Sequence, residues 1–423
     1  MDNAAGCDGA ASLPVGGKGG GRGGAPLRIL TYSTLFPNAA QPLHGVFVEN
    51  RLRHLCAGGA VTAQVVAPVP WFPSGHPRFG TYAAFAKTPR EEWRCGLHVR
   101  HPRYLVVPKV GMALTPLTLY RASVAALAEV RRDGFDFQVI DAHYFYPDGV
   151  AAAMLGRAFR RPVTITARGT DLNLIPRFPL ARRMIRWAAG AADGLITVCQ
   201  ALKDELVSLG VPAQKVRVLR NGVDLDMFRP VDAATARNRL GLSPPVLLCV
   251  GGLIERKRHD LVIRALPRLP GTTLLIAGQG PEAEALERLA GVEGVADRVR
   301  FLGAIPHQEL RNYYSAADVM VLASSREGWA NVLLESMACG TPVVATHVWG
   351  APEVVTAPEA GTLVAEASPN ALADAIRSVL KSPPPRHATR AYAERFGWEP
   401  TTAGQLELFS DIIARHRAAR HGA

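Results

Sequence analysis

Short runs of β-branched and aliphatic residues alternate with longer stretches of helical periodicity along most of this chain. The runs lie at residues 27–31, 61–66, 137–141, 163–166, 195–198 and 216–219 in the first half, and at 246–250, 273–277, 299–302, 319–322 and 342–345 in the second. Short apolar strands separated by helices predict parallel sheets with crossover helices. The chain is therefore predicted to be an α/β protein with a doubly wound sheet in each half.

A turn between the two halves marks the predicted domain boundary. Asn221-Gly222 supplies the backbone angles of a tight turn, and Pro230 ends the segment. The predicted parts are a disordered Gly-rich tail at 1–26, an N-terminal domain at 27–222, a C-terminal domain at 223–395, and a segment at 396–423 whose helix (about 402–416) crosses back to the N-terminal domain.

The composition is that of a globular protein of more than one domain. The 423 residues are 48% hydrophobic and 20% charged, which allows two sizeable cores. No apolar run approaches the length of a membrane span, and residues 1–26 lack the apolar core of a signal peptide. The six cysteines form no CxxC pair and no metal-ligand spacing, and Cys199 and Cys249 fall in apolar runs. We therefore expect no metal site and a reducing, cytoplasmic compartment.

Positive charge is concentrated in the first half. Residues 27–222 contain 25 Lys and Arg against 12 Asp and Glu, whereas residues 223–423 contain 21 against 22. This asymmetry predicts an anionic partner for the first half, such as the inner face of a membrane, a lipid phosphate or an acidic polymer. We expect no nucleic-acid partner. The alternative, a basic bias typical of an Ala/Arg-rich proteome, stays open.

The most informative segment begins where one second-half strand ends. Strand-like residues 319–324 are followed by Glu327 and then by helix-like residues 331–339, with Asn331 as the expected N-cap and Gly340 as the C-terminal stop. Glu327 is thereby expected at the carboxyl end of a strand, where open α/β sheets bind ligands.

This strand-to-helix junction has the residues of a nucleotide-sugar site. The backbone N–H groups of Trp329, Ala330 and Asn331 precede or open a helix, a position that favours an anionic phosphate. Glu335, one turn into the helix, could accept hydrogen bonds from the vicinal hydroxyls of a ribose. Together with Glu327, these residues predict a donor site.

Two glycine-rich turns follow other strands of the second half. Gly251 and Gly252 allow close backbone approach to a ligand, and Lys257 lies where the next helix begins, in reach of a phosphate. Gly280 belongs to a similar turn that could form a wall of the base pocket. The alternative is that tight strand-to-helix turns need glycine whether or not a ligand binds.

Polar residues also follow two strands of the first half. His143 and Asp148 come after the run at 137–141, and Arg168 and Asp171 come after the run at 163–166. Each has a structural alternative, since His143 could be a hydrogen-bonded core histidine and Asp171 could stabilise a turn. Their convergence predicts an acceptor-side rim facing the second domain, to which we also assign Gly45.

Two further segments combine aromatic residues with cations. Residues 71–103 have little periodicity and are predicted to be a long loop, and residues 179–189 form a short basic amphipathic helix. For both, packing on the protein and contact with an acceptor or a membrane remain alternative interpretations.

With these motifs the chain resembles the retaining glycosyltransferases of family 4. The resemblance rests on E-x7-E at Glu327 and Glu335, on V-G-x-L-x-x-x-K ending at Lys257, on N-G-V-D at 221–224, and on the interrupted end helix after Gly397-Trp398. It implies the GT-B fold, in which two Rossmann-like domains flank an interdomain cleft and the C-terminal domain holds most of the donor.

The resemblance also implies roles for residues. Glu335 is expected on the ribose, Glu327 on the transferred sugar, Lys257 on the diphosphate and His143 beside the reacting sugar. It further implies a metal-independent reaction, because cationic side chains and helix N-termini neutralise the leaving diphosphate. No cofactor is expected, since the UDP- or GDP-linked sugar is a substrate. One departure concerns Gly252, since the family commonly has arginine there, and Arg256 or Arg258 are candidates to replace it.

The predicted function is transfer of a sugar, with retention of configuration, from a nucleotide-sugar donor to a hydroxyl acceptor. The setting would be bacterial polysaccharide or lipid-linked glycan synthesis, in the cytoplasm or peripherally on the inner membrane face. Two alternatives are open. Gly252 leaves room for a non-catalytic nucleotide-sugar-binding subunit, and two doubly wound domains also suit an NAD-dependent oxidoreductase, although no GxGxxG follows the first strand.

Overall fold

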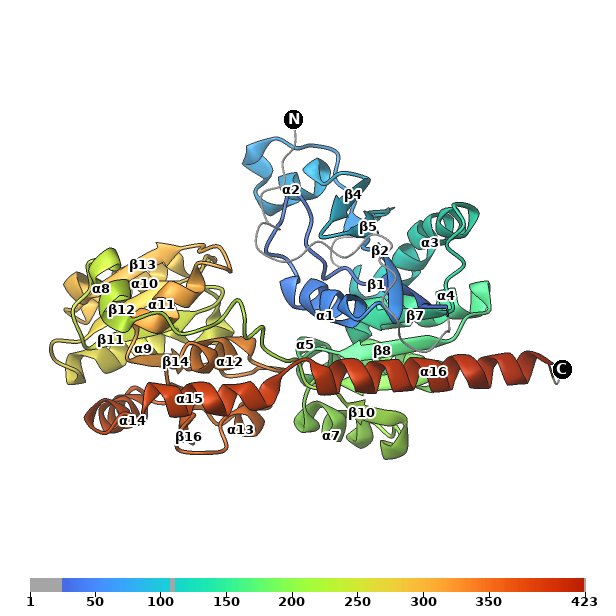
Figure 1. Ribbon diagram of the computed structural model, residues 1–423. Coiled ribbons are helices and arrows are strands. Elements are labelled where there is room, and N and C mark those ends of the chain that lie inside the picture. Colours follow the sequence, from blue (N-terminus) through green and yellow to red (C-terminus); the bar gives the residue numbers. More distant parts are fainter. Residues whose placement is uncertain (1–24, 107–110, 422–423) are drawn as a thin grey trace. The chain divides into compact units, whose positions relative to one another are not determined.

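The computed structural model describes residues 25–106 and 111–421, which form two compact units (Figure 1). Unit 1 comprises the described residues up to Val198, Leu202–Leu219 and those from Pro400 onward, and unit 2 comprises Cys199–Ala201 and Arg220–Glu399. All but the last two residues of the predicted Gly-rich tail lie outside the described residues.

Unit 1 is built on an eight-stranded sheet with the order β10-β9-β8-β7-β1-β2-β5-β4. Every neighbouring pair is parallel except β4 and β5. The central strands β7 and β8 are buried along their whole length, as expected where both faces of a parallel sheet are covered. The strands are β1 (Leu27–Tyr32), β2 (Val61–Val66), β4 (Glu91–Arg94), β5 (Leu97–Arg100), β7 (Val139–His143), β8 (Val163–Ala167), β9 (Gly194–Thr197) and β10 (Val216–Val218).

The last helix, α16 (Glu399–His421), is part of the core of unit 1 and is longer than the sequence predicted. Leu408, Phe409, Ile412 and Ile413 form one apolar stripe in a buried cluster that also contains residues of α1 (Val46–Ala57) and of strands β1, β2, β5, β7 and β9. The remaining helices of unit 1 are α2 (Thr81–Lys87), α3 (Gly111–Arg132), α4 (Val150–Phe159), α5 (Thr170–Asn173), α6 (Pro179–Ala191) and α7 (Gln200–Ser208).

A buried arginine reinforces this attachment of α16. Arg51 of α1 is 1% exposed, and its Nε donates to Oε1 of Gln405 in α16 at 2.9 Å. Its Nη1 donates to the backbone carbonyl of Leu219 at 3.0 Å. A buried guanidinium needs such acceptors, so α1, α16 and the end of β10 are held together by one side chain.

The prediction of a long loop at residues 71–103 was wrong in part. The segment contains α2 and the antiparallel pair β4 and β5, and β3 (Val69–Pro70) pairs with β6 (Arg103–Tyr104) at its ends. In β5, Leu97 and Val99 are buried on the sheet. The hairpin was missed because arginine, histidine and glutamate fill its other positions, which hides the alternation of period two.

Unit 2 is built on a six-stranded, all-parallel sheet with the order β13-β12-β11-β14-β15-β16. Its edge strand β16 was not predicted, because the strand opens with Gly361. That glycine has φ +126°, and a Cβ atom there would lie 1.9 Å from the carbonyl oxygen of Val343. The strands are β11 (Val246–Val250), β12 (Thr273–Ala277), β13 (Val299–Gly303), β14 (Val319–Leu322), β15 (Val343–Thr346) and β16 (Gly361–Val364).

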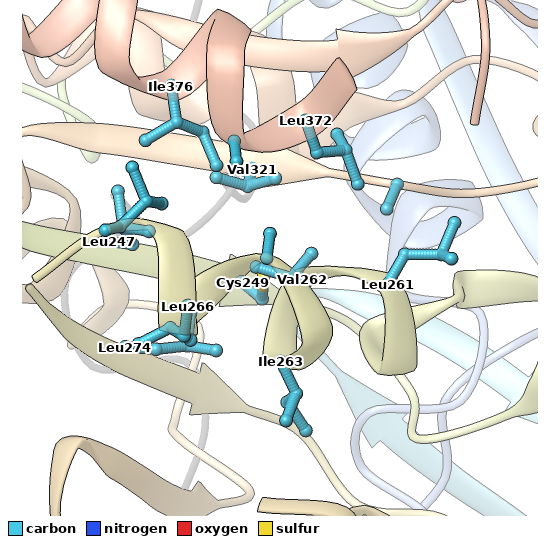
Figure 2. Close-up of a cluster of buried hydrophobic side chains, with 14 of the residues drawn as sticks. Leu247, Cys249, Leu261, Val262, Ile263, Leu266, Leu274, Val321, Leu372 and Ile376 are labelled. Atoms are coloured by element: carbon cyan, nitrogen blue, oxygen red, sulfur yellow. The ribbon is translucent and has the colours of Figure 1, made fainter. Parts of the chain in front are cut away.

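The core of unit 2 lies between this sheet and the helices on it. Figure 2 shows part of it, in which α9, α14 and three strands meet through Leu247, Cys249, Leu261, Val262, Ile263, Leu266, Leu274, Val321, Leu372 and Ile376. The helices of unit 2 are α8 (Ala233–Leu240), α9 (His259–Ala265), α10 (Ala283–Val292), α11 (Leu310–Ala316), α12 (Asn331–Ala338), α13 (Ala351–Val354), α14 (Pro369–Lys381) and α15 (Arg386–Ala393).

Each sheet has a topological switch point. In unit 1, β1 pairs with β2 on one side and with β7 on the other, and in unit 2, β11 likewise pairs with β12 and β14. The chain leaves these paired strands in opposite directions, which opens a crevice at their carboxyl ends. The polar residues that the sequence singled out follow β7 and β8 in unit 1 and β11 and β14 in unit 2.

Across residues 25–106 and 111–421, no helix has both the length and the apolar composition that crossing a bilayer requires. Cys199 and Cys249 are buried free thiols, as predicted, and so are Cys56 and Cys339. Cys95 is disulfide-bonded.

Truncating Phe409, which is fully buried, tests the place of α16 in unit 1. We expect Phe409→Ala to lower the free energy of unfolding of unit 1 by about 3–5 kcal/mol, because a cavity replaces the ring. Hydrogen exchange would then accelerate in α1, β9 and β10, which α16 contacts, and stay unchanged in β11 to β14. The exposed neighbour Ser410→Ala is the control, and protection lost first in unit 2 would contradict this assignment.

Candidate functional site

In unit 2, the turn after β11 is shaped around a lysine side chain. Gly251 has φ +148°, and a Cβ atom there would lie 3.2 Å from Cε of Lys257. The lysine side chain therefore runs across the glycine, in space that any other residue would take from it. Gly252 differs, because a Cβ atom there would meet only the carbonyl oxygen of Gln279, at 3.7 Å.

The ammonium group of Lys257 lies on the acid that follows β14. Its Nζ donates to Oε1 of Glu327 at 2.7 Å, and Nη1 of Arg256 is 3.5 Å from the same oxygen. Nη1 of Arg256 also donates to the carbonyl of Arg326 at 3.1 Å, and N of Ser325 donates to the carbonyl of Arg256 at 2.8 Å. Two strand-end loops, about seventy positions apart in the sequence, are thus joined by two cations and one carboxylate.

These cations decide the charge state of Glu327. Burial alone would raise the pKa of this carboxyl, which is 8% exposed, but Lys257 and then Arg256 outweigh burial and the pKa is lowered. Glu327 is therefore ionised at neutral pH. Lys257, Arg256 and Glu327 together carry two positive charges and one negative charge, so an anionic ligand next to them would meet a net positive site.

The turn after β12 forms the next wall of this loop cluster. A Cβ atom at Gly278 would lie 1.9 Å from the carbonyl oxygen of Gly251, and one at Gly280 would lie 2.2 Å from that of Leu253. N of Leu253 donates to the carbonyl of Gln279 at 2.9 Å. Gly280 is therefore required by contact between two turns, which is the structural alternative considered for it, and its part in donor binding stays a prediction.

Glu335 is held separately from the lysine. On α12 it is 8% exposed, accepts a hydrogen bond from the Tyr314 hydroxyl at 2.9 Å, and lies 3.0 Å from Nε2 of His307. Burial lowers the pKa of His307, but Glu335 and Asp224 raise it, and the net shift is upward. Two partners thus orient the carboxylate and leave part of its acceptor capacity for another donor.

Asn331 does not cap α12 as predicted. The helix begins at Asn331 after Ala330, which supplies no side-chain cap, and Oδ1 of Asn331 instead accepts from Nδ2 of Asn221 at 3.2 Å. Trp329 is 7% exposed, and within the described residues its Nε1 has no hydrogen-bond partner. Gly340, with φ +80°, ends the helix as predicted.

In unit 1, His143 lies in a buried chain of polar groups. Nη2 of Arg168 is 2.6 Å from Nδ1 of His143, Oδ2 of Asp141 is 3.2 Å from Nε2, and Oγ1 of Thr164 donates to Oδ1 of Asp141 at 2.8 Å. Burial lowers the pKa of His143 to about 4; Asp141 opposes this shift, whereas Arg168 adds to it. The imidazole is therefore neutral at pH 7, and the contact with Arg168 assigns its proton to Nε2.

Asp148 and Asp171 are fully buried and bind backbone at the same end of the sheet. Asp148 accepts from N of Thr34 at 2.7 Å and from the hydroxyls of Thr34 and Ser33. Asp171 accepts from N of Phe145 and N of Gly169, each at 2.7 Å. Asp171 thus stabilises a turn, as its structural alternative proposed, and Asp148 attaches the loop after β1 to the segment after β7.

Gly45 shapes the other end of the loop after β1. It has φ +71°, and a Cβ atom there would lie 2.3 Å from the carbonyl carbon of Leu35. Phe47, two residues on, lies under the guanidinium of Arg168, with 5.4 Å from Cζ to the ring centroid. Gly45 is thereby placed near the His143 cluster by packing.

Sequence reasoning missed four of the residues that complete these clusters. Asp141 and His143 are two apart on β7, so their side chains leave the same face of the strand, a signal that was readable. His307 follows β13 at the carboxyl edge of the same sheet as Glu327 and could have been found in the same way. Tyr314 and Ser325 carry no pattern that distinguishes them.

The comparisons with known proteins all find glycosyltransferases. The model described as glycosyl transferases group 1 matches residues 232–396, and the model described as glycosyltransferase family 4 matches residues 60–227. A GDP-mannose-dependent alpha-(1-6)-phosphatidylinositol monomannoside mannosyltransferase of Mycolicibacterium smegmatis is 31% identical over 340 residues, which cover 76% of this chain and 85% of that protein. The chain belongs to these glycosyltransferases.

Another relative of this glycosyltransferase is a D-inositol 3-phosphate glycosyltransferase of Mycobacterium tuberculosis. It is 32% identical over 329 residues, covering 72% of this chain and 68% of that protein. The predicted family and a glycosyltransferase activity are thereby confirmed, and an NAD-dependent oxidoreductase is not favoured.

Solved structures of low identity show the same fold. The sucrose-phosphate synthase of Thermosynechococcus elongatus superimposes with a TM-score of 0.75 at 22% identity, covering 92% of this chain and 100% of that one. Anabaena Alr3699/HepE in complex with UDP-glucose gives 0.69 at 20% identity, covering 91% and 100%. WaaG, a glycosyltransferase involved in lipopolysaccharide biosynthesis, gives 0.66 at 16% identity, covering 90% and 99%. The predicted GT-B fold is confirmed.

The neutral state of His143 makes stability depend on pH. Its folded pKa of about 4 lies below the ordinary value of 6.5, so its contribution is present above pH 6.5 and is lost as pH falls toward 4. We expect the free energy of unfolding of wild type to fall by about 3 kcal/mol over that range because of this group, at about 1.4 kcal/mol per pKa unit. When the free energy of unfolding in urea is measured between pH 7 and 4, His143→Gln should not show this part of the dependence on pH. The exposed His387→Gln should keep it, and equal slopes in both variants would contradict a neutral His143.

Proposed function

We propose that this glycosyltransferase transfers a sugar from a UDP- or GDP-linked donor to a hydroxyl group of a lipid-linked glycan, with retention of configuration and without a metal. The observation that carries the proposal is the contact of Lys257 and Arg256 with Glu327 at the switch point of unit 2. The relative from Mycolicibacterium smegmatis is named for GDP-mannose and a phosphatidylinositol mannoside, and the Anabaena structure holds UDP-glucose.

The chemistry asks for positive charge where the diphosphate leaves. The bond between the anomeric carbon and the phosphate oxygen breaks, its electron pair goes to that oxygen, and the sugar becomes oxocarbenium-like. Lys257 and Arg256 stabilise the departing phosphate, a task that a metal performs in other enzymes. The acceptor oxygen then bonds to the anomeric carbon, and its proton passes to the leaving phosphate oxygen on the same face, which retains the configuration.

Glu327 fits this scheme better as an organiser than as a nucleophile. Its carboxylate is engaged by two cations, which lowers its pKa and its basicity. It keeps both cations in position before the donor arrives and contacts the transferred sugar once the donor is bound. Glu335, held by His307 and Tyr314, presents its remaining lone pairs to the ribose, and His143 lies beside the reacting sugar.

A lipid-linked acceptor places the reaction at a membrane surface. We propose a peripheral, cytoplasmic enzyme on the inner face of the membrane, with no nucleic-acid partner and no cofactor. The support is the positive charge concentrated in residues 27–222 and the lipid substrate in the name of the mycobacterial relative. The acceptor-side set in this scheme is Gly45, Asp148, Arg168 and Asp171.

Transfer from a panel of UDP-, GDP- and ADP-sugars in the presence of EDTA tests the proposed reaction. We expect one donor to be used, with the product anomer matching the donor by NMR. Lys257→Ala should lower kcat/KM about 100- to 1,000-fold, as when one charge-stabilising donor is removed from an active site. The control is Arg258→Ala, because that guanidinium is paired with Asp260 at 3.0 and 3.1 Å. Wild-type turnover in Lys257→Ala would exclude the leaving-group role.

Arg256 accounts for the family arginine that is absent at position 252. Of the two candidates, Arg258 is turned to Asp260, whereas Arg256 lies beside Lys257 on Glu327. The second cation of the site therefore comes from the residue before the lysine. Position 252 is still open enough for a side chain, since a Cβ atom there makes only an ordinary contact.

A rescue experiment separates this role from loss of structure. We expect Arg256→Ala to lower kcat/KM about 10- to 100-fold, because a charge next to the diphosphate is lost. The double variant Gly252→Arg/Arg256→Ala should recover most of that loss, whereas Gly252→Arg alone should change little. A double variant no better than Arg256→Ala, with both folded, would show that Arg256 is not this second cation.

A further inference from the structure

A basic cavity of about 760 Å³ lies along α6 in unit 1. Its walls are α6 and the connection from the end of α7 to β10, with Arg182, Arg183, Arg186, Trp187 and Lys215 among the lining residues. The end of α6 leads into the amino end of β9, whereas His143 and Arg168 lie at the carboxyl ends of β7 and β8. Most of the cavity therefore lies toward the opposite end of the strands. It therefore belongs to neither cluster described above.

The arginines of this cavity are not neutralised by acids of the described residues. Residues 172–192 contain no Asp or Glu. Arg182, Arg183 and Arg186 are exposed, and among the described residues none of them has an ion-pair partner. Nζ of Lys215 donates to the carbonyls of Ala189 and Gly190, at 2.7 and 3.0 Å, which holds its charge at the wall of the cavity. Such a surface attracts anions, and the attraction weakens with salt.

The same helix also exposes large apolar side chains. Phe178 is 46% exposed, Leu180 51% and Trp187 38%. The opposite face of α6, with Ala181 and Ile185, is buried in unit 1. The helix is thus fixed to the protein by one face and presents a mixture of guanidinium groups and apolar rings on the other, which is the composition of a helix that lies in a membrane interface.

The basic character continues beyond Trp187. The guanidinium of Arg157 lies over the Trp187 ring, 5.0 Å from its centroid, and Arg157 also lines a second cavity of about 570 Å³. That cavity is further lined by Arg160 and Arg420, by Arg161, which is paired with Asp136, and by one acid, Asp193. The cationic surface is therefore broader than a site for one small anion needs to be.

We propose that α6 and the cavity beside it form a docking surface for the headgroups of anionic phospholipids. The arginines and Lys215 would contact the phosphates, while Phe178, Leu180 and Trp187 enter the interface between headgroups and acyl chains. A free phosphate or phosphorylated metabolite would use the cations and leave these apolar groups in water, so the observations favour the membrane. The surface deepens the proposed function, because a lipid-linked acceptor has to be reached there.

Vesicle co-sedimentation of the full chain tests the surface without requiring turnover. We expect binding to vesicles that contain phosphatidylglycerol and none to pure phosphatidylcholine. The variant Arg182→Gln/Arg183→Gln/Arg186→Gln should bind the anionic vesicles on the order of 100-fold more weakly, given the contribution of each cation near such a surface. Phe178→Ser/Leu180→Ser should also weaken binding, by a smaller factor that persists at high salt.

A charge-matched variant in unit 2 controls for net charge. Arg264, Arg288 and Arg377 are paired with Glu293, Glu284 and Asp374, and replacing these three arginines by glutamine removes the same total charge. This variant should keep wild-type binding. The proposal is overturned if the two triple variants bind alike, or if wild type ignores phosphatidylglycerol.

A thermal-shift measurement with inorganic phosphate tests the alternative that the cavity binds a soluble anion. If inorganic phosphate raises the Tm of wild type but not of the α6 variant, and vesicles bind both equally, the cavity serves a free phosphate and the membrane proposal is wrong. Hydrolysis of the nucleotide sugar, followed in the same samples, should be unchanged by the α6 substitutions. Failure of the glycosyltransferase proposal would therefore be seen separately from failure of the docking surface.

Discussion

The contact of Lys257 and Arg256 with Glu327 is the interaction on which the donor end of unit 2 depends. It joins the loops after two strands that are neighbours in the sheet but distant in the chain. Neither charge could be buried alone without a large desolvation cost, so each loop is stabilised in its conformation by the other. Glycines at 251 and 278 complete the arrangement, because they let the lysine and the next turn come close to the backbone.

Unit 1 solves a similar problem with different groups. Asp141, His143 and Arg168 are buried side by side, and because His143 is neutral, no further positive charge lies beside that guanidinium. Asp171 accepts from backbone N–H groups and shapes its turn, whereas Asp148 accepts from one backbone N–H and two hydroxyls, and burial raises the pKa of Asp148 to about 7.

The sequence was most informative where strands are apolar and continuous. All eleven runs correspond to strands, and Glu327 and Lys257 could be connected because β11 and β14 adjoin in a doubly wound sheet. The hairpin β4–β5 and strand β16 were hidden by charged residues and by a leading glycine. Asn331 was misjudged as a cap, since its amide is used by Asn221 from another segment. Likewise, the partners of Glu335 come from a loop and a helix whose approach depends on tertiary packing, which no local pattern records.

The position of α16 has a consequence for how the protein is made. Unit 1 takes its first residues and its last helix from opposite ends of the described chain, with all of Arg220–Glu399 between them. During synthesis, unit 2 has its complete sequence before the ribosome has produced Phe409 and its neighbours. The apolar surface of α1 that lies against α16 is therefore still partly uncovered after unit 2 has been synthesised. This order of synthesis separates the folding of unit 2 from the completion of the core of unit 1.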